Sequence, residues 1–332
     1  MKILFINIDR KVDYQSDVVF HGLKTLYGRD VYEISNNWFM FNDMSEEQKQ
    51  KLKRMHGKGF STTGLLDSKL RNVITTREVR KKVKQRFFDL VVYGAIWRCQ
   101  KHFDLISIFY PKERIISIDG KDQTYIHSFF ANKTLHFKRE LIDNHKGIFP
   151  ISFAIPKEKI INEIKPKEKM LAHIIPGDVS TYIYENESDY YHDYAISYFG
   201  KTTKKSGWDC FRHYEIMANG CIPWFPDLSD CPKEIMTSFP KELILKTNNV
   251  FDEISNKAGV CNHELLNEYC EQIRNFTKEH LTTDKIAEYL INTALSQKII
   301  KTDNKSPFFL ALIVAELWNK IKRMINDMKN RR

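Results

Sequence analysis

Short apolar runs alternate with longer polar or amphipathic stretches along most of the chain. In the first half these runs are Ile3 to Ile8, Phe88 to Tyr93 and Arg114 to Ile118. Apolar runs of this length between amphipathic stretches predict buried strands of parallel sheets that are covered by helices. Asp9, Gly94 and Asp119 lie at or just after the ends of the three runs, where open α/β sheets collect their ligands.

The second half repeats the alternation. Its predicted strands are Ala195 to Phe199, Cys221 to Phe225 and Leu243 to Leu245. Residues 262–281 and 284–297 carry apolar side chains at helical spacing and are therefore expected to form helices.

A stretch rich in proline and charge separates the two halves. Proline is absent before Pro111 and then recurs at Pro150, Pro156, Pro166 and Pro176. Such a stretch is typical of a crossing between domains. We expect a Rossmann-like α/β domain at residues 1–165, a second at 166–305 and a separate helix at 306–332.

Composition narrows the function classes. The chain has 332 residues, 42% of them hydrophobic, and a formal net charge of +10 that favours an anionic partner. Its six cysteines include no C-x-x-C pair, which argues against a disulfide framework and a zinc knuckle and favours a reducing compartment. The apolar start ends at Asp9, too early for a signal peptide, and no run reaches the ~18 apolar residues of a membrane span.

The most informative stretch is KKSGWDCFRHYEIMANGCIPWF, residues 204–225. A basic, glycine-containing loop follows a predicted strand, a helix is expected to begin at Asp209 as its N-cap, and Gly220 is a suitable residue just after its end. A loop of this kind before a helix N-terminus offers backbone N–H groups and positive charge to a diphosphate. The candidate donor-binding residues are Lys204, Lys205, Ser206, Gly207, Asp209, Arg212, Glu215 and Gly220.

Arg212 and Glu215 are three residues apart and so share a face of that helix. Arginine matches phosphate with a planar fork, and a carboxylate can accept hydrogen bonds from the vicinal hydroxyls of a ribose. The alternative is an ordinary surface pair worth about 0.3 kcal/mol. The surrounding strand, loop, glycine and second strand favour the nucleotide site.

Residues Arg212 to Pro223, RHYEIMANGCIP, resemble the donor-side helix of GT-B glycosyltransferases, especially the exostosin-like branch. The resemblance covers residues 195–245 and implies two Rossmann-like domains facing a cleft. It also implies that Glu215 binds the ribose and that Arg212, with Lys204 or Lys205, binds the diphosphate. Many retaining relatives have a second glutamate eight positions before the first, where this chain has Gly207, so their stereochemistry is not carried over.

Candidate catalytic residues follow the strands of the first half. Asp17 and His21 are four residues apart, so a helix starting near Ser16 would let the carboxylate orient the imidazole. The alternative is an acid in the first helical turn beside a histidine packed on the sheet. Asp119 and Asp122 flank a glycine and could bind sugar hydroxyls, act as a base or hold a metal, although Asp-Gly is also a common turn.

Lys138 and Arg139 follow another apolar run and are candidate acceptor-binding residues, with a solvated helix start as the alternative. The Asp-x-x-Asp spacing differs from the metal-binding Asp-x-Asp of GT-A enzymes. We therefore expect no required metal or other cofactor.

Two basic stretches point to an anionic membrane surface. Residues 69–86 contain eight Lys or Arg and one acid, with apolar side chains at near-helical spacing. Residues 307–332 predict a basic amphipathic helix around Trp318, which suits a membrane interface or packing on the protein's own core.

The sequence therefore predicts a glycosyltransferase that moves a sugar from a nucleotide-sugar to a glycan or lipid-linked acceptor. The expected setting is polysaccharide or lipopolysaccharide synthesis on the cytoplasmic side of a membrane. The alternatives are a sugar-nucleotide epimerase of the same shape, a glycan-binding pseudoenzyme and a nucleic-acid-binding protein that uses the basic faces. No RNP-like pattern, zinc spacing or helix-turn-helix supports the last.

Overall fold

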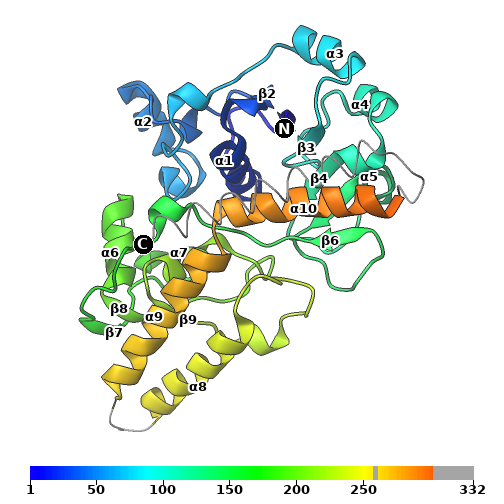
Figure 1. The fold of residues 1–332 in the computed structure, drawn as a ribbon. Coiled ribbons are helices and arrows are strands. Elements are labelled where there is room, and N and C mark those ends of the chain that lie inside the picture. The colour runs from blue at the N-terminus through cyan, green and yellow to red at the C-terminus, as the bar shows by residue number, and fades with distance from the viewer. Residues whose placement is uncertain (257–260, 302–332) are drawn as a thin grey trace, which may run out of the picture. The chain divides into compact units, whose positions relative to one another are not determined.

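Two all-parallel sheets organise the chain (Figure 1). The computed structural model describes residues 1–256 and 261–301. The chain divides into two compact units, Met1–Ile291 and Asn292–Arg332, and both sheets lie in the first. The expected α/β class with two parallel sheets is thus confirmed, whereas the domain boundary near residue 165 stays a prediction.

The first sheet has six strands in the order β2-β1-β3-β4-β5-β6. The strands are β1 (Ile3–Ile6), β2 (Val31–Glu33), β3 (Leu90–Tyr93), β4 (Ile115–Asp119), β5 (Leu135–Lys138) and β6 (Ile148–Pro150). The helices between them are α1 (Tyr14–Tyr27), α2 (Glu46–Leu52), α3 (Thr76–Lys84), α4 (Phe103–Phe109) and α5 (Ser128–Lys133). Because β1 pairs with both β2 and β3, the strand order reverses beside β1 and opens a crevice at its carboxyl end.

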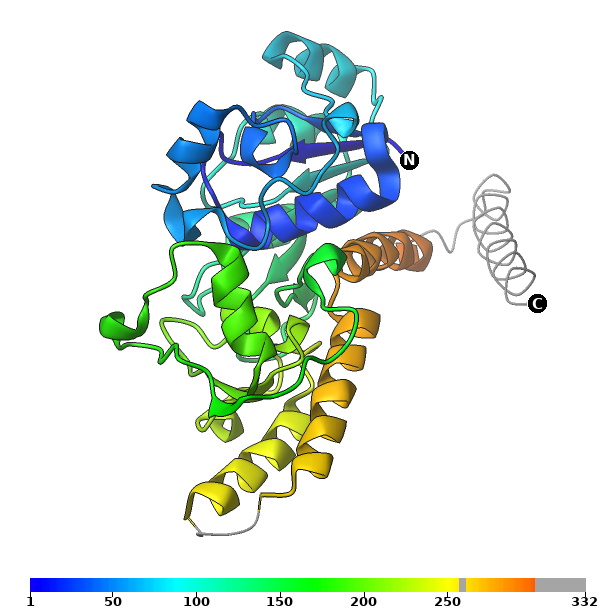
Figure 2. The ribbon, with the colours of Figure 1, turned by 90° about the vertical axis from the view of Figure 1, so that its left-hand side faces the viewer.

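The second sheet has three strands in the order β7-β8-β9. They are β7 (Lys169–Leu171), β8 (Ser197–Lys201) and β9 (Ile222–Trp224), and α6 (Glu187–Ala195) and α7 (Phe211–Ala218) connect them. Three helices follow: α8 (Lys241–Asn256), α9 (His263–His280) and α10 (Thr283–Lys301). Helices α8 and α9 lie side by side in both ribbon views (Figures 1 and 2).

Each sheet has its own buried cluster of apolar side chains. Around the first sheet, Leu4, Val91 and Tyr93 pack with Val79 and Val83 of α3. Around the second, Phe199 and Ile222 pack with Tyr214, Phe251 and Ile273 of the surrounding helices. Burial of these faces fixes both sheets, and their polar strand ends are left to line cavities.

One predicted strand is wrong. Leu243 to Leu245 lies within α8, whose buried face consists of Ile244, Thr247, Asn248 and Phe251. This spacing follows the helical repeat, which a run of only three apolar residues could not reveal. Strands β2, β5, β6 and β7 were not predicted: β2, β5 and β7 each contain a charged residue that interrupts the apolar run, and β6 is only three residues long.

The predicted helix at 306–332 lies outside the described residues. Within the described part of the chain, no helix combines the length and apolar character that a membrane crossing requires.

Candidate active site

Two adjoining cavities lie where the carboxyl ends of both sheets meet. The larger has a volume of about 520 Å³ and is lined by residues that follow β1, β3, β4 and β8. The second, of about 440 Å³, is lined by residues that follow β7 and by α6 and α7. Their walls share Tyr14, Lys205, Cys210 and Phe211, so the cavities form one continuous cleft.

Asp13 lies in the loop between β1 and α1 and lines the larger cavity. It is the N-cap of α1, and its Oδ1 accepts a hydrogen bond from the Ser16 backbone N–H at 3.2 Å. Its Oδ2 lies 3.2 Å from Arg98 Nε, on the loop after β3. Burial raises the pKa of Asp13, and the nearby Arg98 charge opposes that shift. A carboxyl group with a raised pKa beside an open cavity can accept a proton.

Asp17 and His21 do not form the expected pair. Helix α1 begins at Tyr14, which places Asp17 in its first turn, where Oδ2 accepts a hydrogen bond from the Asp13 N–H at 3.0 Å. His21 Nδ1 lies 2.8 Å from Thr283 Oγ1 at the start of α10. Both side chains are fully buried, and neither lines the two cavities described above. The prediction that Asp17 orients His21 is therefore wrong, because each has its own partner.

The two remaining candidate acids form ion pairs with the two basic residues that were predicted to bind the acceptor. Asp119 ends β4 directly beside Lys138, which ends β5, and Oδ2 lies 3.2 Å from Nζ. Arg139 forms an ion pair with Asp122, and its guanidinium also donates to the Gly120 carbonyl at 2.9 Å. Asp122 and Arg139 line the larger cavity, whereas Asp119 and Lys138 lie behind its wall. No group of three or more potential metal ligands occurs among residues 1–256 and 261–301.

Glu140 holds the basic loop that precedes α7. Its two carboxylate oxygens accept hydrogen bonds from the backbone N–H groups of Trp208 and Asp209, both at 3.0 Å. A Cβ atom at Gly207 would lie only 2.6 Å from Glu140 Oε1, so this close approach requires glycine. Two N–H groups that the sequence suggested for a diphosphate are thus already bonded to a carboxylate.

His213 fixes the same loop from the inside of α7. Its Nε2 lies 2.9 Å from the Trp208 carbonyl and its Nδ1 lies 2.8 Å from Thr202 Oγ1. Burial lowers the pKa of His213 to about 3, so the ring is neutral at physiological pH. A neutral ring can donate to the carbonyl and accept from the hydroxyl, which ties both ends of the loop together.

Asp209 is not the N-cap of α7, as the sequence suggested. The N-cap position belongs to Cys210, and helix α7 begins at Phe211. The Asp209 carboxylate instead accepts from the Phe153 N–H at 2.8 Å and from the Tyr214 hydroxyl at 3.1 Å. Burial raises its pKa to about 7, although the nearby Arg139 charge acts in the opposite direction.

Arg212 lines the second cavity. Its Nε and Nη1 atoms are buried and have no hydrogen-bond partner in the described part of the chain. The guanidinium lies 5.5 Å from the centre of the Tyr182 ring. Unpartnered buried N–H groups are costly for a protein, so a ligand with acceptor oxygens would bind here favourably.

Glu215 lies one turn further along α7 and lines the same cavity. Its Oε2 accepts a hydrogen bond from the Tyr190 hydroxyl at 2.8 Å, and its Oε1 accepts one from the Ser61 hydroxyl. The side chain is only 8% exposed, and burial raises its pKa against the effect of these hydrogen bonds. Arg212 and Glu215 thus share one cavity wall, as their spacing predicted.

The remaining loop residues divide into two groups. Lys205, Ser206 and Gly207 line the larger cavity, and Lys205 reaches both. Lys204 is exposed outside the two walls, with its N–H bonded to Asp227 Oδ2 at 3.1 Å and its ammonium 5.0 Å from the Trp208 ring. Gly220 comes directly after Asn219, the C-cap of α7, and its φ of 58° ends the helix there, as predicted.

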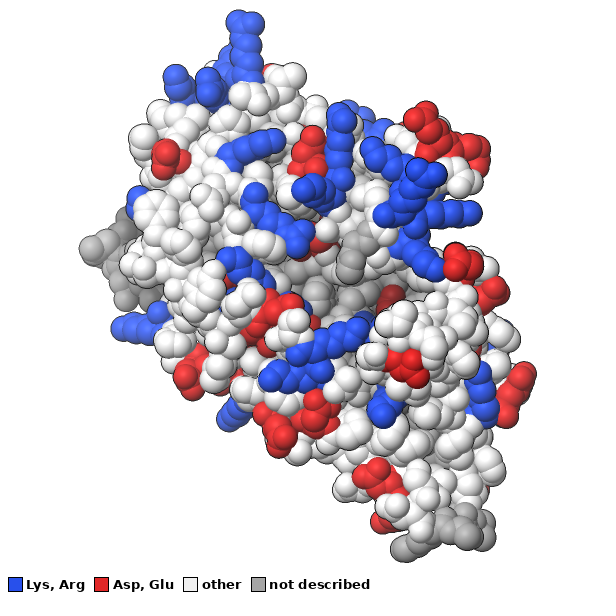
Figure 3. All heavy atoms as spheres, turned by 180° about the vertical axis from the view of Figure 1, so that it is seen from behind, with Lys and Arg blue, Asp and Glu red and all other residues white. Residues whose placement is uncertain are grey.

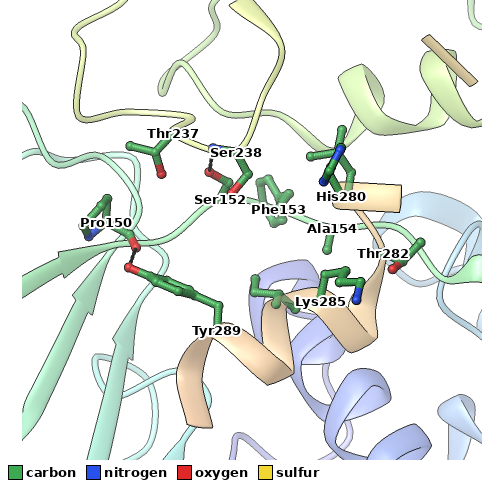
Figure 4. A pocket seen from close by; sticks show the side chains of 12 residues that line it. Pro150, Ser152, Phe153, Ala154, Thr237, Ser238, His280, Thr282, Lys285 and Tyr289 are labelled. Carbon is green, nitrogen blue, oxygen red and sulfur yellow. Dashed lines mark hydrogen bonds between the residues drawn. The ribbon is translucent and has the colours of Figure 1, made fainter. Parts of the chain in front are cut away.

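A third hollow, of about 130 Å³, lies between the segment after β6 and the start of α10 (Figure 4). The Tyr289 hydroxyl donates to the Pro150 carbonyl there at 3.0 Å. It holds none of the predicted site residues, and ligand pockets usually measure about 300 Å³ or more. The cleft is therefore the better candidate for a nucleotide-sugar.

Several residues of the cleft escaped the sequence reasoning. Asp13 was one of several acids after the first strand, and only the start of α1 distinguishes it. Glu140 and Ser61 gave no local signal, because each acts on a segment distant in sequence. The aromatic wall of the second cavity, formed by Tyr182, Tyr184 and Tyr190, could have been noticed as a dense group of tyrosines.

Comparison with known proteins supports the fold. No protein-family model matches the chain, and no curated protein sequence matches it. The structure is similar to a glycosyltransferase from Rickettsia africae, with a TM-score of 0.51 and 8% identity over 91% of this chain and 99% of that one. Anabaena HepE in complex with UDP-glucose has a TM-score of 0.46 and 8% identity, covering 89% of this chain and 100% of that one. Acinetobacter baumannii MurG has a TM-score of 0.41 and 8% identity, covering 88% and 99%. The first similarity confirms the two-sheet α/β fold of GT-B glycosyltransferases.

Proposed function

We propose that this chain is a glycosyltransferase that transfers a sugar from a nucleotide-sugar to an acceptor hydroxyl. The observation that carries the proposal is the Arg212 guanidinium, whose buried Nε and Nη1 have no hydrogen-bond partner within the described residues, in a cavity that also holds Glu215. An unsatisfied cation and a carboxylate on one helical face suit the diphosphate and the ribose of one ligand. The fold and the RHYEIMANGCIP segment both agree with this proposal, and the segment favours the exostosin-like branch.

The donor would lie across the two cavities. In this arrangement Arg212 and Lys205 hold the diphosphate, and Glu215 accepts hydrogen bonds from the ribose. The tyrosines of the second cavity supply flat apolar surfaces for the base. The charge that develops on the departing diphosphate is met by Arg212 and Lys205, so the proposal requires no metal.

Asp13 is the proposed base. The acceptor oxygen attacks the anomeric carbon, its proton passes to the Asp13 carboxylate, and the bond to the diphosphate oxygen breaks with its electron pair leaving on the nucleotide. A single displacement of this kind inverts the configuration at the anomeric carbon. Arg98, 3.2 Å from Asp13, orients the carboxylate toward the larger cavity.

Calorimetric titration with UDP, GDP, CMP and ADP tests the donor site. One of these nucleotides should bind the wild-type chain, and Arg212→Ala and Glu215→Ala should both weaken it, the first more strongly because it removes charge. Lys204→Ala is the matched control, since Lys204 lies outside both cavity walls. Unchanged affinity in both site variants would defeat the assignment.

A glycan or lipid-linked acceptor, used in surface polysaccharide or lipopolysaccharide synthesis, belongs to the same proposal. The basic side chains of α3 support it: Val79 and Val83 face the core, and Arg77, Arg80, Lys81 and Lys84 are exposed. They form the group of blue side chains at the upper left of Figure 3. Such a face would hold the enzyme at the anionic cytoplasmic side of a membrane.

Sedimentation with vesicles tests this membrane contact. Vesicles that contain phosphatidylserine should carry the protein down, whereas vesicles of phosphatidylcholine alone should not. Replacing Arg80, Lys81 and Lys84 by Gln should weaken the binding. Equal sedimentation with both vesicle types would remove the membrane part of the proposal and leave the donor site untouched.

A further inference from the structure

A loop segment of the first sheet contacts α7, the helix that carries Arg212 and Glu215. Residues 57–64 lie in the long connection between β2 and β3, far in sequence from α7. Their contacts are nevertheless with α6, α7 and the residues just before α6. The segment thus enters the second cavity, whose wall includes Lys58 and Phe60.

Ser61 makes the central contacts of this segment. Its hydroxyl bonds to Glu215 Oε1 and lies 2.7 Å from the Tyr191 hydroxyl. Its backbone N–H bonds to Glu187 Oε1 at the start of α6. The Ser61 hydroxyl is therefore hydrogen-bonded to one of the two oxygens of the Glu215 carboxylate, the group proposed to bind the ribose.

The other oxygen of Glu215 has a different kind of partner. Oε2 accepts from Tyr190, which lies on α6 between β7 and β8 and therefore belongs to the same sheet system as α7. Tyr190 can stay with Glu215 when a ligand enters, whereas Ser61 belongs to another part of the fold. With Ser61 in place only 8% of the Glu215 surface is exposed, which leaves little room for a vicinal diol.

The segment is held by contacts that can be released. Lys58 Nζ donates to the Tyr184 carbonyl at 3.0 Å and pairs with Glu185 at 3.1 Å, and the Glu185 side chain is 84% exposed. Lys58 and Ser61 have φ values of 53° and 70°, a left-handed conformation that is unfavourable for residues other than glycine. The exposed ion pair contributes little to holding the segment, so the contacts that release would break are the stacking of the Phe60 ring on Tyr190, at 5.7 Å, and the bond from the Ser61 N–H to Glu187.

We propose that Ser61 occupies the ribose position of Glu215 in the ligand-free chain, and that donor binding exchanges the serine hydroxyl for a ribose hydroxyl and releases residues 57–64. This inference rests on the proposed donor site. The segment acts as a built-in competitor, so the apparent affinity for the nucleotide is reduced by the fraction of molecules in which Ser61 is bound. Release of the segment also frees Lys58 and Phe60 to reposition beside the bound donor.

Calorimetry with UDP, or with whichever nucleoside diphosphate binds, tests the exchange. Ser61→Ala removes the hydroxyl bonded to Glu215 and should bind the nucleotide about tenfold more tightly than wild type, because a hydrogen bond to a carboxylate no longer competes. Ser229→Ala, at an exposed serine, is the matched control and should leave the affinity unchanged. Thermal unfolding of both variants checks that the fold is retained.

Trypsin cleavage after Lys58 gives a second measurement. Saturating nucleotide should accelerate this cleavage in the wild-type chain, whereas Ser61→Ala should be cleaved rapidly with or without nucleotide. An unchanged affinity of Ser61→Ala, or slower cleavage of the wild type with nucleotide bound, would overturn the inference and leave the donor site standing. Failure of every nucleotide to bind either protein would overturn the proposed function and the inference together.

Discussion

Replacing Arg212 by methionine should stabilise the ligand-free protein and abolish tight nucleotide binding. Methionine is similar in length and apolar, so it can fill the space of the arginine side chain beside Tyr182 without carrying N–H groups. Arg212 Nε and Nη1 are buried and have no hydrogen-bond partner among residues 1–256 and 261–301, which makes the arginine costly for the ligand-free fold.

The expected size follows from these two atoms. Each unsatisfied buried polar group costs about 1–3 kcal/mol, whereas the contact of the guanidinium with the Tyr182 ring, at 5.5 Å, returns about 0.5–1 kcal/mol. Two such groups cost about 2–6 kcal/mol, so the free energy of unfolding of Arg212→Met should exceed that of the wild type by about 1–5 kcal/mol. Loss of the charge-assisted hydrogen bonds to phosphate should raise the Kd of the nucleotide about 100-fold, or about 3 kcal/mol.

Urea denaturation without ligand and calorimetry with nucleotide measure the two effects on the same samples. Arg80→Met is the matched control, because Arg80 is an exposed arginine of α3, and it should change neither quantity by a measurable amount. A loss of more than 1 kcal/mol of stability in Arg212→Met together with an unchanged Kd would refute the reasoning. Such a result would mean that the guanidinium supports the fold and takes no part in binding.

Three further predictions concern the acids around the cleft. Asp13→Asn should lower kcat by about 100-fold and leave the nucleotide Kd unchanged. In the wild type, the apparent pKa of the acidic limb of the kcat/KM profile should lie above the ordinary range of aspartate, because burial raises the pKa of Asp13. Glu140→Ala leaves two backbone N–H groups without their acceptor, so the free energy of unfolding measured in urea should fall by about 2–4 kcal/mol. Glu140→Gln keeps one acceptor oxygen and should lose about half as much stability. The pKa of Asp209 rises from 3.8 to about 7 on folding, so its carboxyl group loses its proton at a lower pH in the unfolded chain than in the folded one. The free energy of unfolding should therefore fall by up to about 4 kcal/mol as the pH rises from about 4 to 7, and then level off. Asp209→Asn should flatten this dependence measured by denaturation at each pH, whereas the exposed Asp230→Asn should not, and an unchanged slope in Asp209→Asn would contradict the assignment.

The sequence by itself determined the architecture and the face of one helix. Apolar runs separated by amphipathic stretches predicted the parallel α/β class and five of the nine strands found in the described residues, because burial of both faces of a strand leaves a continuous apolar run. The spacing of Arg212 and Glu215 placed both on one wall of the same cavity, since the helical repeat operates within four residues. Gly220 marked the end of that helix for the same local reason.

Only the tertiary structure decided which charged groups face the cleft and which are already paired. Asp119 and Lys138 neutralise each other because β4 and β5 end side by side, and Glu140 bonds to Trp208 and Asp209 across nearly 70 residues of sequence. Ser61 reaches Glu215 in the same way, over 154 residues. Hydrogen bonds and ion pairs depend on distances of about 3 Å between atoms, and local spacing sets such distances only within one helix or strand. Contacts between distant segments arise from how the sheets and loops pack, which periodicity and composition do not encode.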